Sequence, residues 1–110
     1  MEIHALTLAH HSLVTQFFIQ YWGSPQMARR GQLIDAHLLP GFGAWEGEEL
    51  VGLITYHIQD YDCEIVSLDS LREQQGIGSE LVDRVKKEAQ KRGCKTLWLI
   101  TTNDNLNALR

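Results

Sequence analysis

The feature that most constrains the fold is a glycine-x-glycine segment that joins an apolar stretch to an amphipathic one. Cys63 to Leu68 is rich in apolar and β-branched residues and predicts a strand. Gly76 to Arg92 predicts a helix, because apolar residues recur three or four positions apart and charged residues fall largely on the other side. The apolar positions are Ile77, Leu81, Val82, Val85 and Ala89. Lys95 to Thr102 predicts a second, buried strand, so the unit is a right-handed crossover between parallel strands.

The earlier part of the chain predicts a second set of elements. Ile3 to Leu8 alternates loosely between apolar and polar residues and predicts a strand. His10 to Trp22 has the spacing of an amphipathic helix, and Met27 to Leu38 predicts a weaker helix. Phe42 to Glu46 and Leu50 to Gln59 predict two strands of a hairpin, joined by a tight turn.

Composition argues against several classes of function. The chain has 110 residues, which suffice for one domain with one core, and no repeat or linker divides it. Its net charge is −4 and its positive residues form no basic patch, so no nucleic-acid partner is expected. No apolar run approaches the roughly 20 residues that span a bilayer, and no signal peptide is visible, so we expect a cytoplasmic protein without a membrane partner. Cys63 and Cys94 are expected to be free thiols, and no metal-ligand spacing is present, so no metal is predicted.

The glycine segment also has a chemical implication. The first turn of a helix leaves backbone N–H groups without partners and carries about half a positive charge from the helix dipole. Gly76 and Gly78 would let a phosphate approach those amides closely. The same spacing occurs where a helix simply packs tightly on a sheet, so spacing alone leaves both interpretations open. A dinucleotide-binding fold is disfavoured, because the third glycine position is Leu81 and the motif follows the fourth strand.

The whole pattern resembles the GNAT superfamily of acyl-CoA-dependent N-acyltransferases. In that family a strand is followed by (Arg or Gln)-x-x-Gly-x-(Gly or Ala), an amphipathic helix and a second strand. The matching segments here are Glu64 to Leu68, Glu73 to Gly78, the helix to Arg92 and the strand Thr96 to Thr101. Asn105-Leu106-Asn107-Ala108 is similar to the family's Asn-x-x-Ala.

The resemblance implies a fold, a cosubstrate and a partner. The fold would be α/β (α+β), with a mixed, mostly antiparallel central sheet flanked by helices, and residues 1–110 would form one domain. The cosubstrate would be acetyl-CoA, and the partner would be an amine on a small molecule or a protein. The backbone of Val66 and Leu68 would pair with the pantetheine arm, and the side chain of Asn105 would hydrogen-bond to it. The pyrophosphate would be held by the backbone amides of Gln74, Gln75, Gly76, Ile77, Gly78 and Ser79.

Two features depart from the family pattern. Glu73 stands where the family has Arg or Gln, although Arg72 beside it would offset the added negative charge. The family also has a tyrosine four residues beyond the alanine, as general acid to the leaving thiolate, and then two more strands. Here Ala108 is followed by Leu109 and Arg110, so we expect a domain that is incomplete at its C-terminus and ends after the fifth strand. The open edge of that strand would pair with a second copy, which predicts a homodimer.

A lysine-like amine has a pKa of about 10.4 and is protonated at neutral pH, so a base must take its proton before it can attack. Three side chains are candidates for that base. Glu64 begins the central strand, where several family members place a glutamate base, although such a position is often only a surface one. Asp69 ends the same strand and would equally cap the turn into the glycine loop. His57 lies on the preceding strand, where a lone histidine is commonly structural.

Two hypotheses about function follow. The first is an N-acetyltransferase that moves an acetyl group from acetyl-CoA to a primary amine by direct attack, since no Cys or Ser lies in a nucleophile motif. The alternative is a non-catalytic acyl-CoA-binding domain or an inactive fragment of such an enzyme, which the absent tyrosine favours. The tryptophans are interpreted as core residues or pocket walls: Trp22, Trp45 and Trp98.

Overall fold

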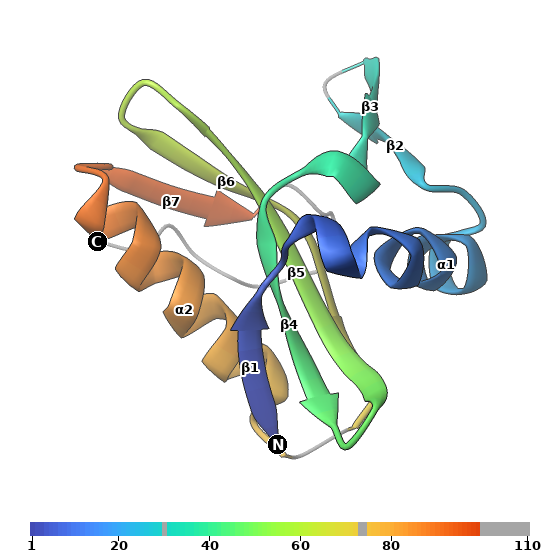
Figure 1. The fold of residues 1–110 in the computed structure, drawn as a ribbon. Coiled ribbons are helices and arrows are strands. Elements are labelled where there is room, and N and C mark those ends of the chain that lie inside the picture. Colours follow the sequence, from blue (N-terminus) through green and yellow to red (C-terminus); the bar gives the residue numbers. More distant parts are fainter. Residues whose placement is uncertain (30, 73–74, 100–110) are drawn as a thin grey trace.

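The protein is built on a five-stranded sheet (Figure 1). The computed structural model describes residues 1–29, 31–72 and 75–99. In spatial order the strands are β1 (Glu2–Ala5), β4 (Gly41–Glu46), β5 (Glu49–Gln59), β6 (Asp62–Ser70) and β7 (Thr96–Leu99). Neighbouring strands from β1 to β6 are antiparallel, whereas β7 runs parallel to β6. The predicted mixed, mostly antiparallel sheet is therefore confirmed.

Among the described residues, one α-helix packs on each face of this sheet (Figure 1). Leu53 and Ile54 are neighbours on β5, and they belong to different cores because successive side chains of a strand point to opposite faces. Leu53 packs with α1 (His11–Trp22), and Ile54 packs with α2 (Ile77–Lys91). We call these two sides the α1 face and the α2 face. The buried residues of α2 match the predicted apolar stripe: Ile77, Leu81, Val85 and Ala89.

The helix predicted from Met27 to Leu38 is wrong. The segment forms a small two-stranded sheet of β2 (Gln26–Arg29) and β3 (Gln32–Asp35), followed by a short 3-10 helix, η2 (Ala36–Leu38). Gly31 lies in the turn between the strands at φ 78°, a left-handed conformation that suits a tight hairpin turn and interrupts a helix. The apolar residues also fail to form one buried stripe, since Leu33 is 67% exposed.

The first strand is shorter than predicted. It ends at Ala5, and a second 3-10 helix, η1 (Leu8–His10), precedes α1. The side-chain oxygen of Thr7 accepts a hydrogen bond from the N–H of Ala9 at 3.2 Å, so a local side-chain cap replaces further strand pairing.

Candidate functional site

The start of α2 is a glycine-opened helix end with unused backbone donors. Gly76 precedes the helix in the left-handed conformation (φ 71°, ψ 15°), which glycine adopts without strain. The N–H of Glu80 donates to the carbonyl of Gly76 at 3.0 Å. Within the described residues, the N–H groups of Ile77, Gly78 and Ser79 have no acceptor, and no side chain caps the helix. Adjacent free donors at the positive end of a helix dipole suit an anion such as a phosphate.

These donors are held firmly on one side and left open on the other. Among the described residues, a Cβ atom at Gly76 or Gly78 would meet no atom within 4 Å. The side chain of Ile77, between the two glycines, is 1% exposed and anchors the first turn to the sheet. On β5, a Cβ atom at Gly52 would lie 2.6 Å from Cγ2 of Ile77, so a glycine there lets the helix start lie this close. The open side remains available to a ligand.

In the described part of the chain, the strand that leads to this helix has an edge without a strand partner. β7 pairs with the first part of β6, from Asp62 to Ile65. From Val66 to Ser70, no strand in the described part of the chain pairs with β6 on that side. Val66 and Leu68, the positions predicted to contact the pantetheine arm, therefore lie on a backbone edge that an extended ligand would need.

A β-bulge marks where this free edge begins. Ser67 pairs with Thr55, but Ile65 pairs with Tyr56, so Val66 is an extra residue in β6. Bulges bend a strand and often lie beside functional sites.

The hydroxyls of Thr55 and Ser67 are buried on the α1 face and form a hydrogen bond of 2.6 Å. No local sequence pattern predicts this pair.

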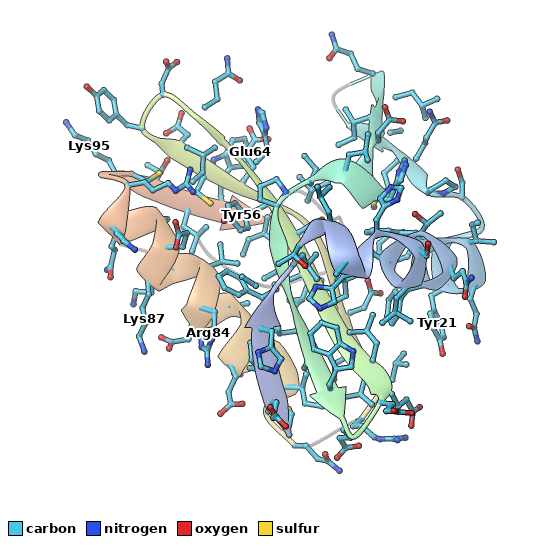
Figure 2. All side chains as sticks on the ribbon, in the orientation of Figure 1. Tyr21, Tyr56, Glu64, Arg84, Lys87 and Lys95 are labelled. Carbon is cyan, nitrogen blue, oxygen red and sulfur yellow. The ribbon has the colours of Figure 1, made fainter. Side chains whose placement is uncertain are left out.

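Two of the predicted base candidates lie side by side. Glu64 and His57 are directly opposite each other on β6 and β5, and Trp98 on β7 is the partner of Glu64 on the other side. Cross-strand neighbours of this kind have Cβ atoms about 5 Å apart. Glu64 is 5% exposed and has an interaction partner, whereas His57 is half-buried. Figure 2 shows Glu64 near the start of β6, far from the β4–β5 turn.

The third candidate, Asp69, lies apart from the other two. Asp69 is five residues along β6 from Glu64, which at about 3.3 Å per residue is roughly 16 Å. Its Oδ2 accepts a hydrogen bond of 2.9 Å from Nε1–H of Trp22, the last residue of α1. Burial raises the pKa of the Asp69 carboxyl, and the indole hydrogen bond opposes that rise. Sequence reasoning does not find this contact, because 47 positions separate the two residues.

The guanidinium of Arg72, expected to offset the charge of Glu73, is paired with two other carboxylates. Its Nε donates to Glu46 at 2.9 Å, and its Nη2 donates to Glu49 at 3.0 Å. The hydrogen bond that Arg72 donates to Glu46, together with the charges of both carboxylates, raises the pKa of Arg72 further. Arg72 therefore ties the segment after β6 to the β4–β5 hairpin. Glu73 lies outside the described residues, so the expectation that Arg72 offsets its charge stays a prediction.

Some predictions about ligands concern other parts of the chain. Gln74 and Asn105, which are predicted to contact the cosubstrate, lie outside the described residues, and Gln75 is exposed beside Gly76. Across residues 1–29, 31–72 and 75–99, no three His, Cys, Asp or Glu side chains gather as a metal site would require. None of the helices in these ranges has both the length and the apolar character to cross a membrane.

The sequence matches the profile of the Acetyltransferase (GNAT) family over residues 8–110. The uncharacterized protein YdhI of Bacillus subtilis (strain 168) is 46% identical over 103 residues, which make up 93% of this chain and 64% of YdhI. This chain therefore spans less than two thirds of the length of that relative.

Two solved structures share the fold. The ribosomal-protein-alanine N-acetyltransferase from Brucella melitensis biovar Abortus 2308 has a TM-score of 0.72 at 17% identity, with 93% of this chain and 81% of that chain covered. The protein Rv2747 from Mycobacterium tuberculosis, solved in complex with CoA and NLQ, has a TM-score of 0.69 at 14% identity, with 94% and 66% covered. These likenesses confirm the predicted fold class.

Proposed function

Because the chain belongs to the Acetyltransferase (GNAT) family, we propose that it binds acetyl-coenzyme A and transfers the acetyl group to a primary amine. The observation that carries the proposal is the start of α2, where the N–H groups of Ile77, Gly78 and Ser79 have no acceptor among the described residues. A diphosphate supplies the oxygen acceptors that these donors lack. The complex of Rv2747 with CoA, in a protein of the same fold, supports the assignment.

The donor would lie along β6. Its pyrophosphate would accept hydrogen bonds from the amides of Gln75 to Ser79, and Gln74 would contribute one more. Its pantetheine arm would pair with the backbone of Val66 and Leu68, where β6 has a free edge within the described residues. Asn105 would hydrogen-bond to the same arm. This path leads the thioester toward the β-bulge at Val66.

The transfer would be direct. The amine nitrogen attacks the thioester carbonyl carbon and forms a C–N bond, the C–S bond breaks, and the sulfur leaves as a thiolate that gains a proton. No covalent intermediate on the protein is needed. Burial raises the pKa of the Cys63 thiol to about 12, which makes it a poor nucleophile and supports direct attack.

Two measurements test the proposal. CoA should raise the melting temperature, because a ligand that binds only the folded state at about 100 times its Kd stabilises it by about 2.7 kcal/mol. Acetyl-CoA with a panel of amines should then release CoA thiol faster than the spontaneous rate. Binding without release would support the non-catalytic acyl-CoA-binding domain instead, and absence of binding would contradict both functions.

The homodimer and the cytoplasmic location remain proposals. Among the described residues β7 is the outer strand of the sheet, and an uncovered outer strand pairs readily with a second chain. Light scattering at high concentration tests the dimer, and a single monomeric species would contradict it.

A further inference from the structure

The β4–β5 hairpin carries two like charges that face each other. Glu46 ends β4, Glu49 begins β5, and the two residues are register partners across the turn. Carboxylates directly opposite each other on neighbouring strands repel and destabilise a hairpin. The guanidinium of Arg72 meets both of them, with Nε–H donating to Glu46 at 2.9 Å and Nη2–H donating to Glu49 at 3.0 Å. A cation from the segment after β6 therefore offsets the repulsion within the hairpin.

This contact depends on the shape of the guanidinium. Its nitrogens lie in one plane at fixed angles, so a single group can donate to two carboxylates at once, whereas a lysine ammonium is a compact charge on a flexible stem. The side chains of Arg72 and Glu46 are each 39% exposed, and ion pairs this open to water add little to global stability. The main effect of the contact is to fix the position of the chain at residue 72.

The same hairpin holds both ends of the segment that leads into α2. At the first end, beside Arg72, the N–H of Leu71 donates to the carbonyl of Val51 on β5 at 2.8 Å. At the second end, Ile77 lies against Gly52, the next residue of β5. The segment between these anchors is short, so fixing both of its ends restricts the positions open to the first amides of α2.

We propose that Arg72 is a positioning residue for the acetyl-CoA donor, and that Glu46 and Glu49 are its anchor. Held there, the chain presents the amides of the first turn of α2 already arranged for the pyrophosphate. This inference rests on the proposed function. Groups arranged before the ligand arrives bind it more tightly, because less conformational entropy is lost on binding. Arg72 acts through the backbone and does not itself touch the phosphate.

Direct binding of the phosphate by Arg72 makes the opposite prediction. If the guanidinium met the diphosphate, Glu46 and Glu49 would compete with the ligand for it, and removal of either carboxylate would strengthen CoA binding. If Arg72 acts through the hairpin, removal of either carboxylate releases the anchor and weakens CoA binding. The sign of the change in affinity distinguishes the two roles.

The test uses Glu46→Ala, with Glu48→Ala as the matched control. Both changes remove one carboxylate from the same hairpin, but Glu48 makes no ion pair within the described residues. In calorimetric titration, Glu46→Ala should bind CoA about 1.5- to 5-fold more weakly than Glu48→Ala, the range for one partly exposed ion pair. Arg72→Gln should weaken binding about 2- to 30-fold, because it loses both pairs. Arg72→Lys should recover part of that loss, since the ammonium keeps the charge without the fork.

A second measurement needs no ligand. In 15N relaxation experiments on the unliganded protein, the order parameters of Gly76 and Gly78 should fall by roughly 0.1 in Glu46→Ala and stay unchanged in Glu48→Ala. Gly93, at the other end of α2, is the internal reference and should not change in either variant. A contact that only stabilised the fold would lower the melting temperature and leave both the order parameters and the CoA affinity of the folded protein unchanged.

The outcomes separate this inference from the proposed function. Equal CoA affinity in Glu46→Ala and Glu48→Ala, or tighter binding in Glu46→Ala, would overturn the positioning role. Order parameters that do not fall in Glu46→Ala would overturn it as well, and this measurement decides the case even if Arg72→Gln fails to fold. Failure of the proposed function would look different, because the wild type would then bind no CoA.

Discussion

Replacing Gly78 with alanine is expected to change folding stability and CoA binding in opposite directions. Gly78 lies in the first turn of α2, outside the left-handed region, and an added Cβ atom would meet no atom of the described residues within 4 Å. Alanine favours a helix over glycine by roughly 0.5–1 kcal/mol. The unliganded variant should therefore melt about 2–8 °C above the wild type.

The same methyl group would occupy space that the proposed ligand needs. The oxygen of a phosphate must come within about 2.9 Å of the amide nitrogens, and Cβ of residue 78 would stand beside that approach. A hydrogen bond to a charged group contributes roughly 1.5–3 kcal/mol. Loss of one such bond would weaken CoA binding about 10- to 150-fold.

The assay is thermal melting with and without CoA, followed by calorimetric titration. Gly76→Ala and Gly93→Ala form a matched pair of controls at the two ends of α2. Both glycines have positive φ, 71° and 79°, and both have open space at Cβ, so each change should cost about 1–2 kcal/mol. Only Gly76→Ala should also weaken CoA binding. The reasoning is refuted if Gly78→Ala binds CoA as tightly as the wild type.

Three further predictions test packing and charge. Gly52→Ala should lower the free energy of unfolding by about 1–3 kcal/mol in denaturant titration, because its Cβ would lie 2.6 Å from Cγ2 of Ile77; an unchanged midpoint would contradict this close approach. Ser67→Ala should cost about 1–3 kcal/mol, since it leaves the buried hydroxyl of Thr55 without its partner. Adding Thr55→Val should recover part of that loss. A double variant whose loss of stability equals the sum of the two single losses would contradict the coupling between these hydroxyls. The folded-state pKa of Cys63 is raised from 9.0 to about 12, so the thiol stays protonated to a higher pH in the folded state than in the unfolded chain. Stability should therefore fall as pH rises from 9.0 toward about 12, and Cys63→Ala should flatten that part of the pH profile of unfolding.

The element that carries the proposed site could be predicted because its signals are local. Ile77 and Leu81 lie one helical turn apart on the buried face, and this spacing needs no knowledge of the rest of the fold. Gly76 and Gly93 mark the two ends of α2, and both take the positive φ values that glycine favours. Helix, boundaries and open amides therefore follow from one continuous stretch of sequence.

The segment from Met27 to Leu38 misled prediction because its apolar residues fit a helix and a hairpin almost equally well. Met27 pairs with Ile34 across the hairpin, and the same two residues are seven apart, which is also a helical repeat. Gly31 decides between them through its backbone conformation, which a periodicity argument does not weigh.

The contacts within the site were beyond prediction for another reason. Trp22 and Asp69 meet because α1 packs on one face of the sheet and its last residue lies against the C-terminal end of β6. No local sequence pattern encodes that packing. The bulge at Val66 depends in the same way on how β5 and β6 align. Side-chain partners across a sheet follow from the assembled fold, and a single sequence gives its elements more readily than their alignment.

The stretch of β6 from Val66 to Ser70, which has no strand partner on one side among the described residues, also determines which genetic changes the protein can accept. On the proposed function, a pantetheine arm of fixed length is anchored by its phosphate at one end of this stretch and presents its thioester at the other. Inserting or deleting a single residue would shift those two points by about 3.3 Å relative to each other, which is as large as the gap across which the reacting atoms must meet. We expect homologous enzymes and engineered variants to differ freely in the side chains of this stretch, but not in the number of residues it contains.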